Sequence, residues 1–397
     1  MTRSTSVLLV LGALVALGPL STDAYVPGLP ELAGDLRSSA SMTQLTVTTC
    51  LIGLAAGQLV AGPMSDALGR RTPLLLGLGV FTAASLLCAT APNVGTLILF
   101  RAPQGIGGAF ALVIAYACVR DRYAGKAAAR YFSLLLLVTG LAPVLSPLAG
   151  AQILRVSGWR AIFVALAVLS FVVLVVCVRA LPESLPPHRR RTSGLRVYGR
   201  LLKDRRLVGY ALVNAFVFAA MFAYISGSPF VLQTIHGLSA EQYSVVFAVN
   251  ASGLVAAAQA SGRLVRYVET RSLLAAGVIG AAGGGVALLV SVATGAGLWP
   301  LLASLFAAVA SVGLVLPNAL TLALENHGDH AGAAAALLGF AQFLFGGLVA
   351  PLVGFQGAGS AMPMAAVIAG LGLAGTITLA ALVKPDHSPT HEEVHHD

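Results

Sequence analysis

The chain has 397 residues, of which 57% are hydrophobic and only 10% charged, and its mean hydropathy is +0.87. Soluble domains carry about 25% charged residues, so this composition excludes a soluble globular protein and indicates a polytopic membrane protein. The formal net charge is +9. The cations lie in short segments between apolar runs rather than along one surface, which argues against nucleic-acid binding.

Twelve apolar runs along the chain are each long enough to cross a bilayer as a helix, which takes about 20 residues. The first run continues past the distance at which secretory signals are cleaved, so we interpret it as an uncleaved span. A polar linker separates the first six runs from the last six. The sequence therefore predicts an all-α polytopic membrane protein with 12 transmembrane helices in two six-helix halves. The predicted spans are 6–26, 42–64, 73–90, 95–118, 131–153, 160–180, 207–230, 243–264, 272–294, 299–323, 332–353 and 361–383.

Lysine and arginine residues gather in alternate loops, as the positive-inside rule describes. All but four of the 24 lie on the side that holds both termini and the linker, which we therefore predict to be cytoplasmic. The four exceptions are Arg37, Arg155 and Arg160 on the opposite side and Arg101 within a span. The predicted organisation is an N-terminal half 1–180, a basic cytoplasmic linker 181–206, a C-terminal half 207–383 and a cytoplasmic tail 384–397.

The linker and the tail are polar and rich in basic residues or histidine. We predict that the linker is a solvated tether beside anionic lipid head groups and that the tail is disordered rather than metal-binding. The four cysteines all fall within apolar runs and lack paired spacing, which indicates neither a disulfide framework nor a zinc site. We expect no metal and no cofactor.

Asp23 is a carboxylate within the first predicted span, in the segment Gly18-Pro-Leu-Ser-Thr-Asp23-Ala-Tyr-Val-Pro27. A charged group in a bilayer is costly, and those that persist usually mark an ion or substrate path. The fourth span contains the opposite charge, Arg101. Because arginine stays protonated in proteins, Arg101 can tune a proton carrier but cannot be one. We therefore predict that Asp23 carries a coupled proton beside Arg101.

The loop between spans two and three reads Gly62-Pro-Met-Ser-Asp66-Ala-Leu-Gly69-Arg70-Arg71. This sequence resembles the cytoplasmic motif of the major facilitator superfamily. We expect Gly62 to permit close helix contact and Gly69 a tight turn. Asp66 and Arg70 are expected to form a charge cluster that breaks when the halves move, with Arg71 beside it. Asp121, at the end of span four, is the expected third member.

Two further stretches resemble the proton-coupled and drug-exporting members of that superfamily. Arg101 is followed by Gln104-Gly105, a pattern associated there with proton transfer. Span five carries small residues and prolines, which predict a kinked helix with a closely packed face. The same residues resemble the antiporter motif of the drug-exporting branch. These motif residues are Gly140, Pro143, Pro147 and Gly150.

Segments 23–30 and 224–233 resemble the bicyclomycin/chloramphenicol-resistance (Bcr/CflA-type) multidrug exporters, and the resemblance covers nearly the whole chain. It implies a drug:proton antiporter in the inner (cytoplasmic) membrane that exports amphenicol-like or bicyclomycin-like antibiotics. The implied partners are the drug, protons and lipid, without nucleic acid, and we expect a monomer. The drug site is expected between the halves, with candidates Tyr25, Phe132, Asn214, Tyr224, Asn250 and Gln342.

Three alternatives remain open on the sequence. A proton-coupled uptake symporter or a metabolite exporter would share the fold, although the span-five motif argues against uptake. A membrane enzyme would need a cluster of catalytic side chains, and the nearest candidate is His327-Gly-Asp329-His330, which we expect on the external side. A channel would need a continuous polar lining, which these spans lack. We therefore predict a transporter and not an enzyme.

Overall fold

The computed structural model describes residues 3–190, 196–325, 327 and 331–383, and the described part is built from helices and their connections. The histidine-rich tail lies outside the described residues. The elements of the N-terminal part are α1 (Arg3–Asp23), η1 (Val26–Gly28), α2 (Leu29–Asp35), α3 (Ala40–Leu68), α4 (Arg71–Ala89), α5 (Val94–Arg122) and α6 (Gly125–Ala180). Those that follow are η2 (Pro187–Arg189), α7 (Arg196–Leu201), α8 (Arg205–Pro229), η3 (Phe230–Ile235), α9 (Ala240–Leu264), α10 (Thr270–Ala293), α11 (Leu298–Leu324), α12 (Ala331–Val353) and α13 (Met362–Leu382).

Side-chain caps fix where several of these helices begin. The Ser39 hydroxyl accepts the backbone N–H of Met42 at the start of α3, and the Asn93 amide oxygen accepts that of Thr96 at the start of α5. Ser239 and Gln242 form a reciprocal capping box at the start of α9. Such caps satisfy backbone donors that a helix leaves open in its first turn. They explain why the helices start one to three residues before the predicted apolar runs.

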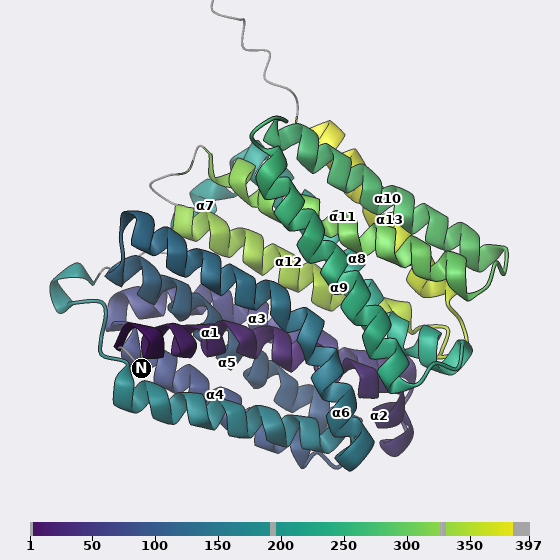
Figure 1. The fold of residues 1–397 in the computed structure, drawn as a ribbon, viewed down its shortest axis with the longest axis horizontal. Helices are drawn as coiled ribbons and strands as arrows, with labels where there is room; N and C mark the ends of the chain where they lie inside the picture. The colour runs from purple at the N-terminus through teal and green to yellow at the C-terminus, as the bar shows by residue number, and fades with distance from the viewer. Residues whose placement is uncertain (1–2, 191–195, 326, 328–330, 384–397) are drawn as a thin grey trace, which may run out of the picture.

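Eleven segments of the described chain are long and apolar enough to cross a membrane, and one of them, Arg130–Ala180, has 51 residues. At 1.5 Å per residue such a segment is more than twice as long as one crossing requires. Gly158, with φ of 71°, interrupts α6 within this segment. Figure 1 shows the two arms of α6 doubling back from that bend. Counting the arms separately confirms the twelve predicted spans.

The helices pack as two groups, which we call the first half (α1–α6) and the second half (α8–α13). Within the first half α3 packs on α5, and α4 on α5 and α6; within the second half α10 packs on α11 and α13. The halves meet mainly where α3 contacts α12 and where α6 contacts α9. In Figure 1 the purple-to-teal half and the green-to-yellow half lie side by side along these contacts.

Uncharged side chains join the halves by donating to backbone carbonyls of the opposite half. Three donors lie on α3: Ser41 to Pro351 at 3.1 Å, Gln44 to Ser226 at 3.1 Å and Thr48 to Gly347 at 2.8 Å. Two donors lie on the second half: Gln233 donates to the Pro27 carbonyl and Ser244 to the Pro147 carbonyl, each at 3.0 Å. We call the end of the bundle that carries α2 and η3 the outer end, and the opposite end the linker end.

Parts of the described linker pack on the helices, whereas many of its described residues are exposed, and the solvated tether beside lipid stays a prediction. Its helix α7 contributes Leu201, which is 3% exposed and packs with Leu207, Ala334 and Leu337 of the second half. Near the N-terminal end of the linker, the Glu183 carboxylate accepts backbone N–H groups at the start of α4. The linker therefore contacts both halves.

His327 also lies at the linker end, which corrects the external position expected for the segment it begins. Its Nε2 atom is 3.1 Å from Oδ2 of Asp204. Asp204 is a linker residue that caps the start of α8. Gly328, Asp329 and His330 lie outside the described residues. Among the described residues, no three His, Cys, Asp or Glu side chains lie together in a way that could hold a metal ion.

Candidate functional site

Asp23 is the last residue of α1, at the point where the helix gives way to η1. Its side chain is buried, with the residue 4% exposed. Its Oδ1 atom has no hydrogen-bond partner among the described residues. An ionised carboxylate that lacks a donor is expensive to bury, whereas the protonated form carries no charge to compensate.

Arg101, on α5, is 0% exposed and is held by neutral groups. Its Nε donates to the carbonyl of Thr46 at 3.1 Å, and its Nη1 donates to Oε1 of Gln104. The guanidinium carbon lies 4.4 Å from the ring centroid of Tyr25 and 5.5 Å from that of Phe163. Cations over aromatic faces are stabilised most where water is excluded. Arg101 is therefore fixed in the interior of the first half and does not reach the interface.

Asp23 and Arg101 lie close enough for their charges to interact, but no ion pair joins them in the described part of the chain. The Nη2 atom of Arg101, like Oδ1 of Asp23, lacks a hydrogen-bond partner there. The structure thus brings the two predicted residues together and leaves one polar atom on each without a protein partner.

Two other sequence candidates lie on the second half, on α8 and α9, and bond to each other. The Nδ2 of Asn250 donates to the phenol oxygen of Tyr224 at 2.9 Å. Tyr243, which the sequence did not single out as a site residue, has its hydroxyl 3.2 Å from that of Ser228. Asp23 is within electrostatic range of both phenols.

The remaining substrate-binding candidates fall in three places. Tyr25 packs beside Arg101, with its hydroxyl 3.0 Å from that of Thr46. Asn214 donates from Nδ2 to Oε1 of Gln342 at 3.0 Å, which links α8 to α12. Phe132 stacks on Tyr116 with ring centroids 6.1 Å apart, between α6 and α5. Tyr25 thus lies with Arg101, two residues after Asp23. Asn214 and Gln342 share a second contact, and Phe132 lies at a third.

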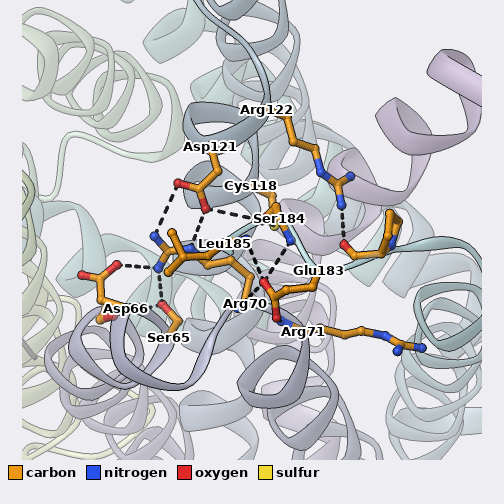
Figure 2. A network of polar contacts seen from close by, with 12 residues as sticks. Ser65, Asp66, Arg70, Arg71, Cys118, Asp121, Arg122, Glu183, Ser184 and Leu185 are labelled. Atoms are coloured by element: carbon orange, nitrogen blue, oxygen red, sulfur yellow. Dashed lines mark hydrogen bonds and ion pairs between the residues drawn. The ribbon is translucent and has the colours of Figure 1, made fainter. Parts of the chain in front are cut away.

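The predicted charge cluster is present at the linker end (Figure 2). The guanidinium of Arg70 lies 2.6 Å from Asp66 and 2.7 Å from Asp121, and it also donates to the Ser65 hydroxyl at 2.8 Å. Arg70 is 3% exposed, so its buried charge has two carboxylate partners, as such a charge requires. The cluster joins the end of α3 to the end of α5.

Three glycine and arginine predictions for this loop have different outcomes. Gly69 adopts φ of 95°, the backbone region expected of a glycine turn. An added side-chain carbon at Gly62 would meet nothing within 4 Å, so the expected close helix contact there is wrong. Arg71 donates to the Val178 carbonyl at 2.7 Å and lies outside the charge cluster. Arg271 makes the matching bond to the Val383 carbonyl at 2.5 Å in the second half.

Glu183 is a member of this region that the sequence interpretation missed. Its carboxylate accepts the backbone N–H groups of Arg70 at 2.8 Å and Arg71 at 3.2 Å, at the N-terminus of α4. It also accepts those of Ser184 and Leu185, each at 2.9 Å. The available signal was that Glu183 is one of only two acidic residues in the basic linker 181–206.

Partial burial by itself raises the pKa of the Glu183 carboxyl, but these backbone hydrogen bonds outweigh it and hold the pKa below its ordinary value. A carboxyl group with a lowered pKa stabilises the fold at neutral pH. That contribution is complete above about pH 4.3, the ordinary pKa of glutamate, and is lost as the pH falls through the lower pKa of the folded protein.

The Glu183→Gln variant should lose about 1 kcal/mol of stability at pH 7, the typical value of a helix cap. The difference from the wild-type protein should shrink as the pH falls below about 4, because the carboxylate is then protonated first in the unfolded state and, at the lower pKa, in the folded state as well. Thermal unfolding of the purified protein across this pH range measures it. Glu269→Gln is the matched control, because Glu269 precedes α10 without a side-chain cap bond. Equal losses in both variants at pH 7 would contradict the assignment.

The predicted antiporter motif lies where α6 contacts α1 and the second half. An added side-chain carbon at Gly150 would lie 1.7 Å from the Ala24 carbonyl oxygen, so Gly150 permits the residue next to Asp23 to pack on α6. The Pro147 carbonyl accepts the Ser244 hydroxyl of the second half. Pro143 lies within the helix, and Gly140 faces Val255 of α9 at 3.5 Å. Gly150 thus places α6 against the turn after α1, and Pro147 and Gly140 place it against α9.

Comparison with known proteins gives a consistent result for this fold. Residues 11–351 match the family model described as Major Facilitator Superfamily. The chain is 39% identical to the uncharacterized MFS-type transporter YdgK of Bacillus subtilis, over 94% of each chain. It is 28% identical to the bicyclomycin resistance protein homolog of Haemophilus influenzae, over 90% of this chain and 91% of that one. It is 27% identical to the multidrug resistance protein MdtL of Shigella flexneri, over 97% of each.

Solved structures agree on the architecture. The D-xylose-proton symporter superposes with a TM-score of 0.77 at 18% identity, covering 96% of this chain and 98% of that one. A bacterial homolog of the lysosomal transporter Spinster, in an inward-facing conformation, gives a TM-score of 0.73 at 15% identity, covering 96% and 95%. These likenesses establish the twelve-helix fold in two six-helix halves.

Proposed function

Because this chain belongs to the major facilitator superfamily, and is therefore a multi-pass membrane transporter and not an enzyme, we propose that it exports drug-like small molecules in exchange for protons. The named relatives in bicyclomycin and multidrug resistance support export. Amphenicol-like or bicyclomycin-like antibiotics are the first compounds to test. We place the protein in the cytoplasmic membrane as a monomer, with the linker end and both termini in the cytoplasm.

The observation that carries the proton coupling is Asp23. It is a buried carboxyl group near Arg101, with one oxygen that has no donor among the described residues, three residues before the turn η1 that contacts the second half. Alternating access opens such an interface to one side and then to the other. In the outward-open state Asp23 takes a proton from outside as the protein releases the drug. In the inward-open state it gives that proton to the cytoplasm as the protein binds drug from the cytoplasm.

The Asp66–Arg70–Asp121 cluster is the proposed conformational switch. Its three charges come from the ends of α3 and α5 and the loop before α4. A buried arginine without its carboxylate partners strongly destabilises the protein. The cluster therefore stabilises the arrangement described here over one in which Arg70 loses Asp66 and Asp121. Movement of the halves requires a second arrangement in which Arg70 has other partners.

The direction of transport in inverted membrane vesicles separates export from uptake. An acidic lumen should drive labelled chloramphenicol or bicyclomycin into the vesicles, because protons leaving the lumen exchange for drug entering it. A proton-coupled symporter would instead carry its substrate out of the lumen. The same vesicles without the imposed gradient provide the baseline. Gradient-driven loss of drug from preloaded vesicles would contradict the proposed antiport.

A further inference from the structure

The turn η1, which begins three residues after Asp23, contacts two helices of the second half, α8 and α9. Gln233 fixes this contact by donating to the Pro27 carbonyl. Gln44 on α3 donates to the Ser226 carbonyl of α8. Asp23 therefore lies next to a turn that is packed against the second half.

The second half presents two buried phenols to this interface. Tyr224 and Tyr243 are 2% and 0% exposed. Phe247 lies between them, with ring centroids 5.6 Å from Tyr224 and 6.2 Å from Tyr243, and this packing fixes both rings. Because side chains with locked rings need little reordering to make a hydrogen bond, the two hydroxyls are well positioned donors.

The hydrogen-bond capacities of the two sides are complementary. Tyr224 accepts a hydrogen bond from Asn250 and also has the Ser228 hydroxyl as a neighbour. Because a serine hydroxyl can donate as well as accept, the Tyr224 O–H hydrogen can go to a new acceptor. Tyr243 shares its hydroxyl contact with Ser228, which can serve as either donor or acceptor. Asp23 Oδ1 accepts no hydrogen bond among the described residues. One half thus supplies donor groups and the other supplies an acceptor without a donor.

We propose that Tyr224 and Tyr243 complete the Asp23 site from the second half, by donating a phenol hydrogen to the ionised carboxylate. Contact between the halves at the outer end then depends on whether Asp23 holds a proton. Asn250 and Ser228 orient the two hydroxyls. This role rests on the proposed antiport and makes the tyrosines positioning residues for it.

No other ionisable group among the described residues donates to Oδ1 of Asp23 in this arrangement. Cys50 on α3 has its sulfur 4.0 Å from the Ser21 hydroxyl. Arg101 on α5 directs Nε and Nη1 to Thr46 and Gln104, and its Nη2 makes no hydrogen bond to the described residues. Since hydrogen bonds to ionised groups are stronger than neutral ones, a phenol donor from α8 or α9 would affect the proton equilibrium of Asp23 measurably.

The test compares Tyr224→Phe, Tyr243→Phe and the double variant with the wild-type protein in inverted vesicles. The double variant should lower the initial rate of proton-driven drug uptake about tenfold, the size expected for one hydrogen bond to a charged group. Its half-maximal pH should move up by about one unit, because removing a donor to the carboxylate favours the protonated form. Because Tyr224 is also a candidate for drug binding, drug exchange without a gradient is compared for Tyr243→Phe alone, and it should stay within about twofold of the wild-type rate.

Tyr116→Phe is the matched control, because its hydroxyl contacts Thr139 within the first half, 3.4 Å away, and not the Asp23 cluster. If wild-type vesicles show no proton-driven uptake, the proposed antiport fails. If the wild-type protein is active and the double variant matches Tyr116→Phe in rate and pH profile, the role of the tyrosines fails while the antiport stands. A fall in the drug exchange of Tyr243→Phe equal to its fall in driven uptake would assign Tyr243 to drug binding and also overturn its proposed role.

Discussion

Replacing Asp23 with asparagine should abolish proton-driven drug accumulation while leaving drug exchange intact. Asparagine keeps the size and polarity of the side chain but cannot release a proton. At a membrane potential of 100 mV, one proton supplies about 2.3 kcal/mol, which supports roughly a fiftyfold gradient of a neutral drug at one-to-one exchange. In the Asp23→Asn variant that gradient should fall to about onefold. Vesicle accumulation assays with an imposed potential measure both numbers.

Asp35→Asn is the matched control for this experiment. Asp35 ends α2 at the outer end of the same half, and its carboxylate pairs with Arg160 and accepts the Trp159 indole N–H at 3.0 Å. Its side chain is 46% exposed, unlike that of Asp23. The control should retain the full gradient. Full accumulation in Asp23→Asn would show that another group carries the proton.

The Gly150→Ala variant should be the most destabilising glycine substitution in the predicted antiporter motif. Its new methyl carbon would lie 1.7 Å from the Ala24 carbonyl oxygen, a backbone atom. Neither helix can relieve this clash by changing a rotamer, so α6 and the turn after α1 must separate. Overpacking of this kind costs about 3 kcal/mol, the upper part of the usual range. Thermal unfolding in detergent and the yield of folded protein measure the loss.

Gly140→Ala on the same helix provides the comparison. Its added carbon would lie 3.5 Å from the Val255 side chain, an ordinary contact. Alanine also favours a helix over glycine by roughly 1 kcal/mol, so this variant should be neutral or slightly stabilised. Comparable stability of the two variants would mean that Gly150 does not bring Ala24 against α6. Because Ala24 adjoins Asp23, any surviving Gly150→Ala protein should also lose proton-driven transport.

The positions of the spans could be predicted from the sequence because the bilayer constrains each segment locally. The predicted span 272–294 became α10 at Thr270–Ala293, and 361–383 became α13 at Met362–Leu382. The first span differed, because the helical path continues beyond Asp23 through η1 and α2. That extension is short and interrupted by prolines, and only its packing against other helices makes it ordered.

The Arg70 cluster was predictable in its main members because Asp66 and Arg70 are only four residues apart, at the end of α3 and just after the Gly69 turn, so the short connection keeps them together. Glu183 was not, because its bond to Arg70 crosses 113 positions of sequence. Asp23 and Arg101 were both expected within the membrane, but the neutral partners of Arg101 were not. Those partners, a carbonyl, an amide and two aromatic faces, come from α3, α5, α6 and the turn after α1.

The sequence by itself determined that this chain crosses a membrane twelve times, which loops carry the positive charge and which acid and arginine lie within spans. Each of these follows from the cost of placing a given residue in hydrocarbon, which acts on the residue wherever its neighbours are. Only the tertiary structure decided which groups meet: Arg101 with the rings of Tyr25 and Phe163, Gly150 with Ala24, and Glu183 with the start of α4. Such partners depend on helix packing that brings distant segments together, and packing is a property of the whole fold.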